Sequence, residues 1–288
     1  MANIIDGKKL ATELNNQTSL LVQNIIDRGL PKPKLVVIQV GENPASSTYV
    51  KNKLKACNAV GIECKDIHLT DSISTAELID KILGFNIDTS VDGILVQLPL
   101  PSHIDERRVI EAISPEKDVD GFTYLNNGRL LTASPSILPC TPAGIVYMLK
   151  YVDKNLTAKN AVILGRSNIV GKPVSLLLQR ENMNVTMLHS KTSTEDKDFY
   201  CRHADVIVVA TGQENTLTER HLYSSNKPII IDVGIHRGLD GKLHGDVSEE
   251  IKENYSSWYT PVPGGVGPMT IAMLLRNTFQ AYERKIVK

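Results

Sequence analysis

Tyr49 and Lys53 form the first pair of residues whose types and spacing could support catalysis. They follow an apolar run and a turn, where Ser46 or Ser47 is expected to cap a new helix. Side chains four positions apart share one face of a helix. An aromatic ring beside an amine could stack on a flat heterocycle while the amine reaches its reactive atom. The alternative is a solvated helix whose lysines simply face water.

Gln97, Asp118 and Asp120 add polar groups in two further segments. Gln97 is the single amide in the run Val-Gln-Leu-Pro-Leu-Pro, which closes an apolar strand, so it is either a satisfied core residue or a site residue. Asp118 and Asp120 stand two residues apart in Pro-Glu-Lys-Asp-Val-Asp-Gly. A turn or a helix cap would explain these carboxylates without any function. Two aspartates are too few for a convincing metal site, so we expect no metal.

Residues 161–178 have the pattern of a nucleotide-binding loop. An apolar strand ends at Gly165, a short loop follows, and Gly171 precedes a helix with Pro173 in its first turn. Such a unit directs unpaired N–H groups and the positive end of the helix dipole toward a pyrophosphate. The glycines are separated by five residues, unlike the usual dinucleotide fingerprint, so a tight turn without a ligand stays open at this point.

The end of the next predicted strand favours NADP over NAD. In an NAD site an Asp or Glu at that place would bind the ribose 2′-hydroxyl. This chain has His189, Ser190, Lys191 and Thr192 there, with no acid. A hydroxyl and a cation suit a 2′-phosphate, and Arg166 could add a second cation. Taken alone, Lys191 would equally fit an ordinary surface loop.

Two more predicted strands end in glycine-containing turns, Val-Val-Ala-Thr-Gly and Ile-Asp-Val-Gly. Ligands of open α/β sheets bind beyond the carboxyl ends of the strands. Thr211, Gly212 and Ile235 are therefore expected to line the dinucleotide. Turn chemistry alone would also explain the glycines.

The elements that must position these residues alternate between short β-rich runs and helical patterns. Several runs are almost continuously apolar, as in parallel strands covered on both faces. The pattern predicts two doubly wound α/β domains, the second a Rossmann-type NAD(P)-binding domain. The last helix is expected to pack back on the first domain. Strands are predicted at 34–40, 62–69, 93–98, 161–164, 184–188, 205–210 and 228–233, and helices at 46–60, 75–85, 173–181 and 269–284.

Composition narrows the class of protein. With 288 residues the chain is long enough for two domains. Lys plus Arg and Asp plus Glu are both 32, so the basic excess of nucleic-acid binders and the basic face of membrane-surface proteins are missing. The four cysteines lack the short paired spacings of zinc or redox sites. We expect a cytoplasmic protein with reduced thiols that binds neither nucleic acid nor membrane.

Six ordered segments resemble one known family. They are Tyr-Val-x-x-Lys-x-Lys-Ala, Val-Gln-Leu-Pro-Leu-Pro, Pro-Glu-Lys-Asp-Val-Asp-Gly, Pro-Cys-Thr-Pro, Gly-Arg-Ser-x-Ile-Val-Gly-x-Pro and Thr-Pro-Val-Pro-Gly-Gly-Val-Gly-Pro-Met-Thr. Together they resemble the bifunctional methylenetetrahydrofolate dehydrogenase/cyclohydrolases. The resemblance extends over essentially the whole chain, from the Ile-Ile-Asp-Gly segment at residue 4 to Thr278.

The resemblance implies a two-domain subunit with a cleft between the domains. A folate-binding catalytic domain would comprise residues 1–139 plus 262–288, and an NAD(P)-binding domain residues 140–261. The family is typically homodimeric, metal-free and active in one-carbon metabolism, which feeds purine biosynthesis. The implied partners are a tetrahydrofolate derivative as substrate and NADP as cofactor, with NAD less favoured.

The resemblance also implies roles for individual residues. Lys53 would be the catalytic lysine, with Gln97 hydrogen-bonded near it and Tyr49 stacked on the pterin. The enzyme would pass a hydride from 5,10-methylenetetrahydrofolate to NADP and then hydrolyse the methenyl cation to 10-formyltetrahydrofolate. Substrate-binding residues would further include Asp120, Pro263, Gly264 and Gly265, and cofactor-binding residues Gly165, Arg166, Ser167, Gly171, Ser190, Thr211, Gly212 and Ile235.

One departure from the family pattern falls near the cofactor side, where His236 replaces an expected Asn. Three alternatives stay open. The chain could be a monofunctional dehydrogenase, a non-catalytic folate- or dinucleotide-binding regulator, or an unrelated oxidoreductase such as a shikimate-type dehydrogenase. Turnover of the folate substrate would separate these readings.

Overall fold

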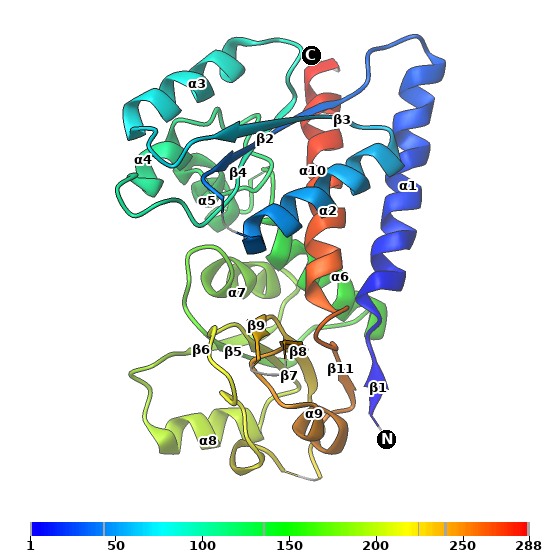
Figure 1. The fold of residues 1–288 in the computed structure, drawn as a ribbon. Coiled ribbons are helices and arrows are strands. Elements are labelled where there is room, and N and C mark those ends of the chain that lie inside the picture. The colour runs from blue at the N-terminus through cyan, green and yellow to red at the C-terminus, as the bar shows by residue number, and fades with distance from the viewer. Residues whose placement is uncertain (1, 43, 135, 224, 239–240, 287–288) are drawn as a thin grey trace. The chain divides into compact units, whose positions relative to one another are not determined.

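The chain forms two compact units in a computed structural model that describes residues 2–42, 44–134, 136–223, 225–238 and 241–286, and for residues 44–46 the backbone only. Unit 1 contains Met1–Ala11 and Thr141–Thr270, and unit 2 contains Thr12–Cys140 and Ile271–Lys288 (Figure 1). Each unit carries its own parallel sheet.

The sheet of unit 2 has three parallel strands in the order β3-β2-β4. Strand β2 (Lys34–Val40) pairs along its length with β3 (Glu63–Leu69) and over four residues with β4 (Gly93–Val96). All three agree with predicted strands to within two residues at either end. Apolar runs mark β2 and β4, whose residues are almost all buried, whereas β3 lies at the edge of the sheet and alternates polar and partly buried residues.

Helices cover both faces of this sheet, as expected of a doubly wound domain. Alternate strand residues point to opposite faces, so Leu35 and Val37 enter one core and Val36 and Ile38 the other. The first core packs against α1 (Gly7–Asp27), α2 (Pro44–Val60) and α10 (Val266–Ile286). The second packs against α3 (Thr75–Ile87) and α4 (Glu106–Glu111). The predicted packing of the last helix on the first domain is confirmed, since Phe279 lies in the first core.

The sheet of unit 1 has six parallel strands in the order β1-β11-β8-β7-β5-β6. A separate antiparallel ribbon joins β9 (His236–Arg237) to β10 (Leu243–His244). Because parallel strands share their direction, the loops that follow β5, β6, β7 and β8 emerge at one edge of the sheet. The sheet strands are β1 (Asn3–Ile4), β5 (Asn160–Leu164), β6 (Asn184–Leu188), β7 (Val206–Val209), β8 (Ile229–Asp232) and β11 (Trp258–Tyr259).

The N-terminal strand β1 changes the boundary predicted from the sequence. It pairs with β11, so residues 1–11 group with unit 1 rather than with the first domain. Residues 262–270 also group with unit 1. Two-residue strands are too short to show periodicity, so this pairing could not be predicted from the sequence. Helices α1 and α10 each contain residues of both units.

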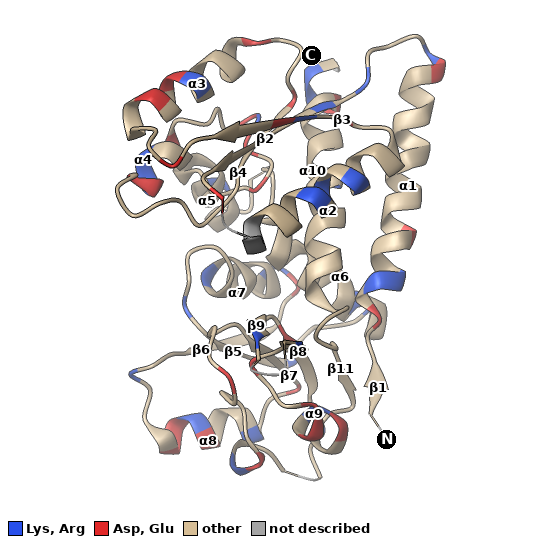
Figure 2. Ribbon diagram, in the orientation of Figure 1, with Lys and Arg blue, Asp and Glu red and all other residues tan. Residues whose placement is uncertain are grey.

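Several helices begin at a side-chain cap. Ser74 caps α3 in a reciprocal capping box with Glu77, and Ser193 caps α8 through the backbone N–H of Asp196. In the view of Figure 2, acidic and basic residues are interspersed on α3 and α8, whereas α2 carries basic residues and no acidic ones. The remaining helices are α5 (Tyr124–Leu131), α6 (Cys140–Val152), α7 (Gly171–Arg180), α8 (Thr194–Arg202), the 3-10 turn η1 (Glu219–His221) and α9 (Glu249–Tyr255).

One predicted cap is wrong. Helix α2 begins at Pro44, so Ser46 and Ser47 lie inside it rather than before it. Proline suits the first helical position because its missing N–H would have had no partner there. The Ser47 hydroxyl instead accepts a hydrogen bond of 2.9 Å from the side-chain amide of Gln39 on β2.

Among the residues that the structure describes, none of the helices combines the length and the apolar character that a membrane-spanning helix needs.

Candidate active site

Lys53 and Gln97 meet in unit 2. The Lys53 ammonium donates a 2.9 Å hydrogen bond to Oε1 of Gln97, and both side chains are partly buried. Gln97 follows β4, and its backbone N–H bonds to the carbonyl of Ile38 on β2. Its own amide nitrogen donates to the carbonyl of Leu98 at 2.7 Å. This second bond orients the amide, so its oxygen is the atom presented to the lysine.

Tyr49 lies one helical turn before Lys53 on α2 and is 37% exposed. Desolvation by partial burial raises the pKa of its hydroxyl, so the ring is a neutral, amphipathic surface at physiological pH. The i, i+4 spacing predicted for the pair is realised in a continuous helix. The other two lysines of this helix, Lys51 and Lys55, are exposed and match the solvated alternative.

Two charged residues of the Pro-Glu-Lys-Asp-Val-Asp-Gly segment, Lys117 and Asp118, are hydrogen-bonded to the surrounding protein. The Lys117 ammonium donates to three backbone carbonyls at the end of α3, those of Phe85, Asn86 and Asp88. Asp118 is 1% exposed, and its carboxylate accepts four N–H donors. These are the backbone amides of Gly121, Phe122 and Thr123 and the side-chain amide of Asn126. The turn predicted as the bland explanation therefore applies to Asp118.

Asp120, in the same segment, lies close enough to Lys53 to feel its charge. Burial raises the pKa of its carboxyl, while the positive charge of Lys53 opposes that shift. The Cys140 thiol donates to the Val119 carbonyl at 3.3 Å, and burial together with the nearby Asp120 charge raises the pKa of the thiol. Asp120 and Lys53 thus belong to one electrostatic cluster with Gln97.

Cys140 and Asn277 support this cluster and were not singled out from the sequence. The Asn277 side-chain amide donates at 2.8 Å to the carbonyls of Val119 and Leu138. It also contacts the sulfur of Cys140 at 3.4 Å. Asn277 comes from α10, so the final helix fixes the backbone just before Asp120 and just before Cys140. A lone asparagine in an amphipathic helix gives no sequence signal for such a role.

The predicted glycine loop follows β5 in unit 1. Gly165 has φ of +126°, and a Cβ added there would lie 2.3 Å from the carbonyl oxygen of Ala210. Gly171 opens α7, and a Cβ there would lie 2.3 Å from the Gly165 carbonyl oxygen. Both positions therefore require glycine for a close backbone approach. A tight turn without a ligand and a nucleotide-binding loop would both require glycine at these two positions.

Ser167 and Arg166 occupy the exposed part of this loop. The Ser167 hydroxyl accepts the backbone N–H of Val170 at 3.1 Å and of Gly171 at 3.2 Å. Its own proton remains available to donate, which suits a phosphate oxygen. Arg166 adds an exposed guanidinium beside it. The loop therefore offers hydroxyl and cationic donors at the N-terminal end of α7.

The turn after β6 holds the predicted 2′-phosphate residues. Backbone and side chains close a tight turn between His189 and Thr192, with bonds of 2.9 Å in both directions. Ser190 and Lys191 are exposed at its tip. A hydroxyl and an ammonium therefore stand beyond β6, where an NAD site would carry an acid.

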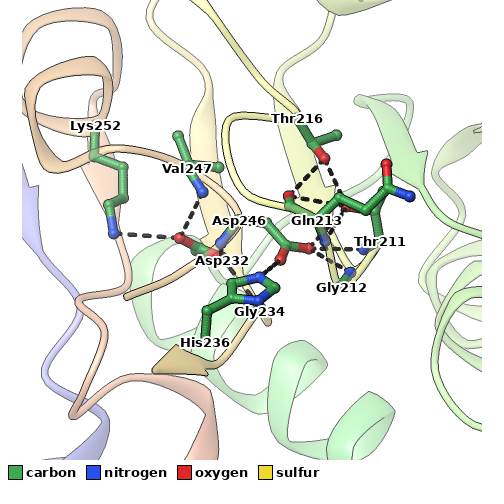
Figure 3. A network of polar contacts seen from close by, with 10 residues as sticks. All are labelled: Thr211, Gly212, Gln213, Thr216, Asp232, Gly234, His236, Asp246, Val247 and Lys252. Carbon is green, nitrogen blue, oxygen red and sulfur yellow. Dashed lines mark hydrogen bonds and ion pairs between the residues drawn. The ribbon is translucent and has the colours of Figure 1, made fainter. Parts of the chain in front are cut away.

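The turn after β7 is held by a buried carboxylate that sequence reasoning did not single out. Asp246 Oδ2 accepts the backbone N–H groups of Thr211 at 2.7 Å and Gly212 at 3.0 Å, and also the Thr211 hydroxyl (Figure 3). These polar groups are engaged within the protein, so the turn contributes its shape and the open face of Gly212. Asp232, at the end of β8, accepts the Asp246 and Val247 backbone amides in turn.

The loop around Pro263, Gly264 and Gly265 packs on the start of α1. The backbone N–H of Lys8 donates to the Gly264 carbonyl at 3.1 Å. A Cβ added to Gly7 would lie 1.9 Å from the Gly265 carbonyl oxygen, which explains the glycine of the Ile-Ile-Asp-Gly segment. Pro263 is exposed, as is Ile235, with 44% of its surface accessible.

A cavity of about 830 Å³ also lies in unit 1, between the β9–β10 ribbon and the start of α9. Its lining includes Glu214, Ser248 and Pro263. Pro263 is the one predicted site residue in that lining, so the cavity as a whole does not coincide with the predicted cofactor residues.

Two family models together match most of the chain. The model described as tetrahydrofolate dehydrogenase/cyclohydrolase, catalytic domain, matches residues 5–120, and the NAD(P)-binding domain of the same family matches residues 139–286. The chain belongs to this family.

Individual relatives agree over the full length. The chain is similar to the bifunctional protein FolD of Agathobacter rectalis, with 47% identity over 99% of this chain and 100% of the relative. A crystal structure of the bifunctional FolD dehydrogenase/cyclohydrolase from Campylobacter jejuni matches with a TM-score of 0.94, 44% identity and 99% of each chain. The Trypanosoma brucei dehydrogenase-cyclohydrolase, solved with NADP cofactor and inhibitor, matches with a TM-score of 0.93 and 32% identity. That match covers 100% of this chain and 99% of the other.

The predicted family, the α/β fold and the assignment as a dehydrogenase and cyclohydrolase are confirmed by these matches. Within the enzyme, unit 2 brings Lys53 and Gln97 into contact and places Asp120 near the lysine charge. Unit 1 gathers the predicted cofactor residues into turns at the carboxyl edge of its sheet. The chemistry of these two sets of side chains is the basis for assigning roles to individual residues.

Proposed function

We propose that the enzyme oxidises 5,10-methylenetetrahydrofolate with NADP to the methenyl cation and hydrolyses that cation to 10-formyltetrahydrofolate. The hydrogen bond between Lys53 and Gln97, beside the Asp120 carboxyl, carries the proposal. It gives a lysine that can exchange protons, an amide that orients it and a carboxyl that can bind a heterocycle edge.

Lys53 is our candidate for the proton transfers of hydrolysis. Water adds to the methenyl carbon and must lose a proton, and the bond from that carbon to N5 then breaks as N5 gains one. Lysine can accept the first proton and return it to N5. The Gln97 oxygen accepts a hydrogen from Nζ in either protonation state of the lysine, so the contact can persist through the transfer.

Substrate binding falls in this proposal to Tyr49 and Asp120. The half-exposed ring of Tyr49 offers a flat surface for the pterin. The Asp120 carboxyl can accept N–H donors from the pterin edge, because Asp118 rather than Asp120 holds the surrounding turn. A contribution of Pro263, Gly264 and Gly265 to folate binding stays a prediction from the resemblance.

The donor set in unit 1 suits NADP. Ser167, Arg166 and the turn around Ser190 and Lys191 offer hydroxyl groups and cations, which favours a phosphorylated ribose over a free 2′-hydroxyl. When bound, NADP supplies the acceptor for the hydride. Gly165 and Gly171 allow the close turn, and Thr211, Gly212 and Ile235 would line the rest of the dinucleotide. The relative from Trypanosoma brucei, solved with NADP, supports this choice.

An absorbance assay with matched lysine variants tests the proposal. Wild-type protein should form the methenyl product faster with NADP than with NAD and should accelerate decay of added methenyl substrate. We expect Lys53→Met to lower the cyclohydrolase rate by about 10²–10⁴-fold, the usual value of a general acid–base group. Lys55→Met, an exposed lysine on the same helix, should keep the wild-type rate.

Substantial hydrolysis by Lys53→Met would refute the role of the lysine. Dehydrogenase activity without hydrolysis in the wild type would favour the monofunctional alternative, and no turnover with either cofactor would favour a regulator. We also retain the homodimer as a proposal from the family resemblance and the cytoplasmic location as a proposal from the sequence. Light scattering of the purified protein would measure its mass in solution.

A further inference from the structure

His236 stands where the family pattern led us to expect Asn, and it bonds to a fully buried carboxylate. Its Nε2 lies 2.7 Å from Oδ1 of Asp246, whose side chain is 0% exposed, whereas the histidine side chain is 20% exposed. Asp246 accepts N–H donors on its other oxygen as well. A carboxylate that only accepts requires a proton on the facing nitrogen, so Nε2 of His236 is the donor.

The same carboxylate sets the backbone of the turn after β7. Asp246 Oδ2 holds the amides of Thr211 and Gly212, and Gly212 is in the left-handed region with φ of +67°. Figure 3 shows Asp246 lying between His236 on one side and this turn on the other. The turn contains residues that the proposed function assigns to the dinucleotide.

The space for this arrangement is created by glycine. A Cβ added to Gly234 would lie 2.0 Å from Oδ1 of Asp246, so the carboxylate occupies the position of the missing side chain. The neighbouring carboxylate, Asp232, has a different partner, the fully buried ammonium of Lys252 at 3.3 Å. Each of the two buried aspartates thus has its own basic side chain.

We propose that His236 is a positioning residue for the cofactor: by donating to Asp246 it fixes the carboxylate that holds the Thr211–Gly212 turn in its dinucleotide-binding shape. It does not touch the reacting atoms. Without the Nε2 donor, the Asp246 carboxylate loses one of its four hydrogen bonds and gains freedom to rotate away from the two amides. The inference rests on the proposed function, because it concerns the affinity for NADP.

Three variants separate positioning from general stability. His236→Leu removes the donor, whereas His236→Gln places an amide N–H near the position of Nε2. His68→Leu changes an exposed histidine of unit 2 and serves as the matched control. We expect His236→Leu to raise the KM for NADP about tenfold, as for loss of one charge-assisted hydrogen bond, while kcat changes less than about twofold. His236→Gln should restore most of the affinity, and His68→Leu should behave as wild type.

Two readouts keep the test independent of folding. KM does not depend on the fraction of folded enzyme, and cyclohydrolase activity without dinucleotide should be unchanged in every variant. If His236→Leu gives no folded protein, His236→Ser takes its place with the same expectation. A wild-type KM for NADP in the donorless variant, no rescue by glutamine, or an equal rise in the KM for folate would overturn the proposal. Failure of the wild type to use NADP at all would instead overturn the proposed function.

Discussion

Lys53 and Lys252 each contact a polar side chain, but their surroundings are opposite. Lys53 is partly buried and bonds to the neutral amide of Gln97 at 2.9 Å. Lys252 is 0% exposed and pairs with Asp232 and Glu249. Asp232 also accepts the backbone N–H groups of Gly234, Asp246 and Val247, whereas the hydrogen bond to Gln97 engages one of the three N–H groups of the Lys53 ammonium. A buried charge that is fully paired therefore belongs to the fold, and a partly buried amine bonded to a neutral amide is the one suited to chemistry.

Removing the buried lysine should have the largest effect on stability. We expect Lys252→Met to lower the free energy of unfolding by about 3–5 kcal/mol, because Asp232 is left as a buried carboxylate without its cation. Urea unfolding followed by circular dichroism measures this change. Lys154→Met, an exposed lysine of the same unit, is the control and should keep the wild-type midpoint. Equal midpoints for both variants would show that the ion pair contributes nothing to stability.

Asp118 and Asp120 show the same contrast between a structural and an available charged group within one segment. We expect Asp118→Asn to cost about 2–3 kcal/mol of stability, because an amide NH₂ would face backbone N–H donors that now reach a carboxylate oxygen. Asp120→Asn should leave stability unchanged, since burial already disfavours the charged carboxyl, but should raise the KM for folate. Urea unfolding and steady-state kinetics on both variants test this. A loss of stability in Asp120→Asn together with a raised KM for folate in Asp118→Asn would contradict this distinction.

His221 should produce a smaller, pH-dependent effect. Burial is the main cause that lowers its pKa from 6.5 to about 4, and its Nδ1 accepts the Thr218 backbone N–H at 2.9 Å. The unfolded chain binds the proton more readily, so the stabilisation is complete above about pH 6.5 and is lost as the pH falls toward 4. Between pH 7.5 and 5 we expect a loss of about 1–2 kcal/mol that His221→Asn, which keeps an acceptor, does not show.

Urea unfolding at the two pH values measures this difference between wild type and variant. His68→Asn, at an exposed position, should follow the wild-type pH dependence. Identical pH dependence in wild type and His221→Asn would show that this histidine is not the responsible group.

Much of the fold was readable because long apolar runs are strong signals. Strands such as β2, β5 and β6 agree with the prediction to within one residue at either end. The start of α2 was misjudged because serine and proline both suit a helix N-terminus. The two-residue strand β1 was missed because it depends on a partner, β11, more than 250 residues away. Short elements of this kind are defined by pairing rather than by periodicity.

Local spacing and ordered motifs were sufficient to predict the family, the two α/β domains and the candidate reactive residues. Which charged groups stabilise the fold could be seen only in the folded chain. Asp118 and Asp120 are equivalent in the sequence, yet the donors that engage Asp118 distinguish them. The joining of His236 to Asp246 and of Asp246 to the turn after β7 also arises across loops. Such assignments depend on burial and hydrogen-bond partners, which are set by packing between distant segments.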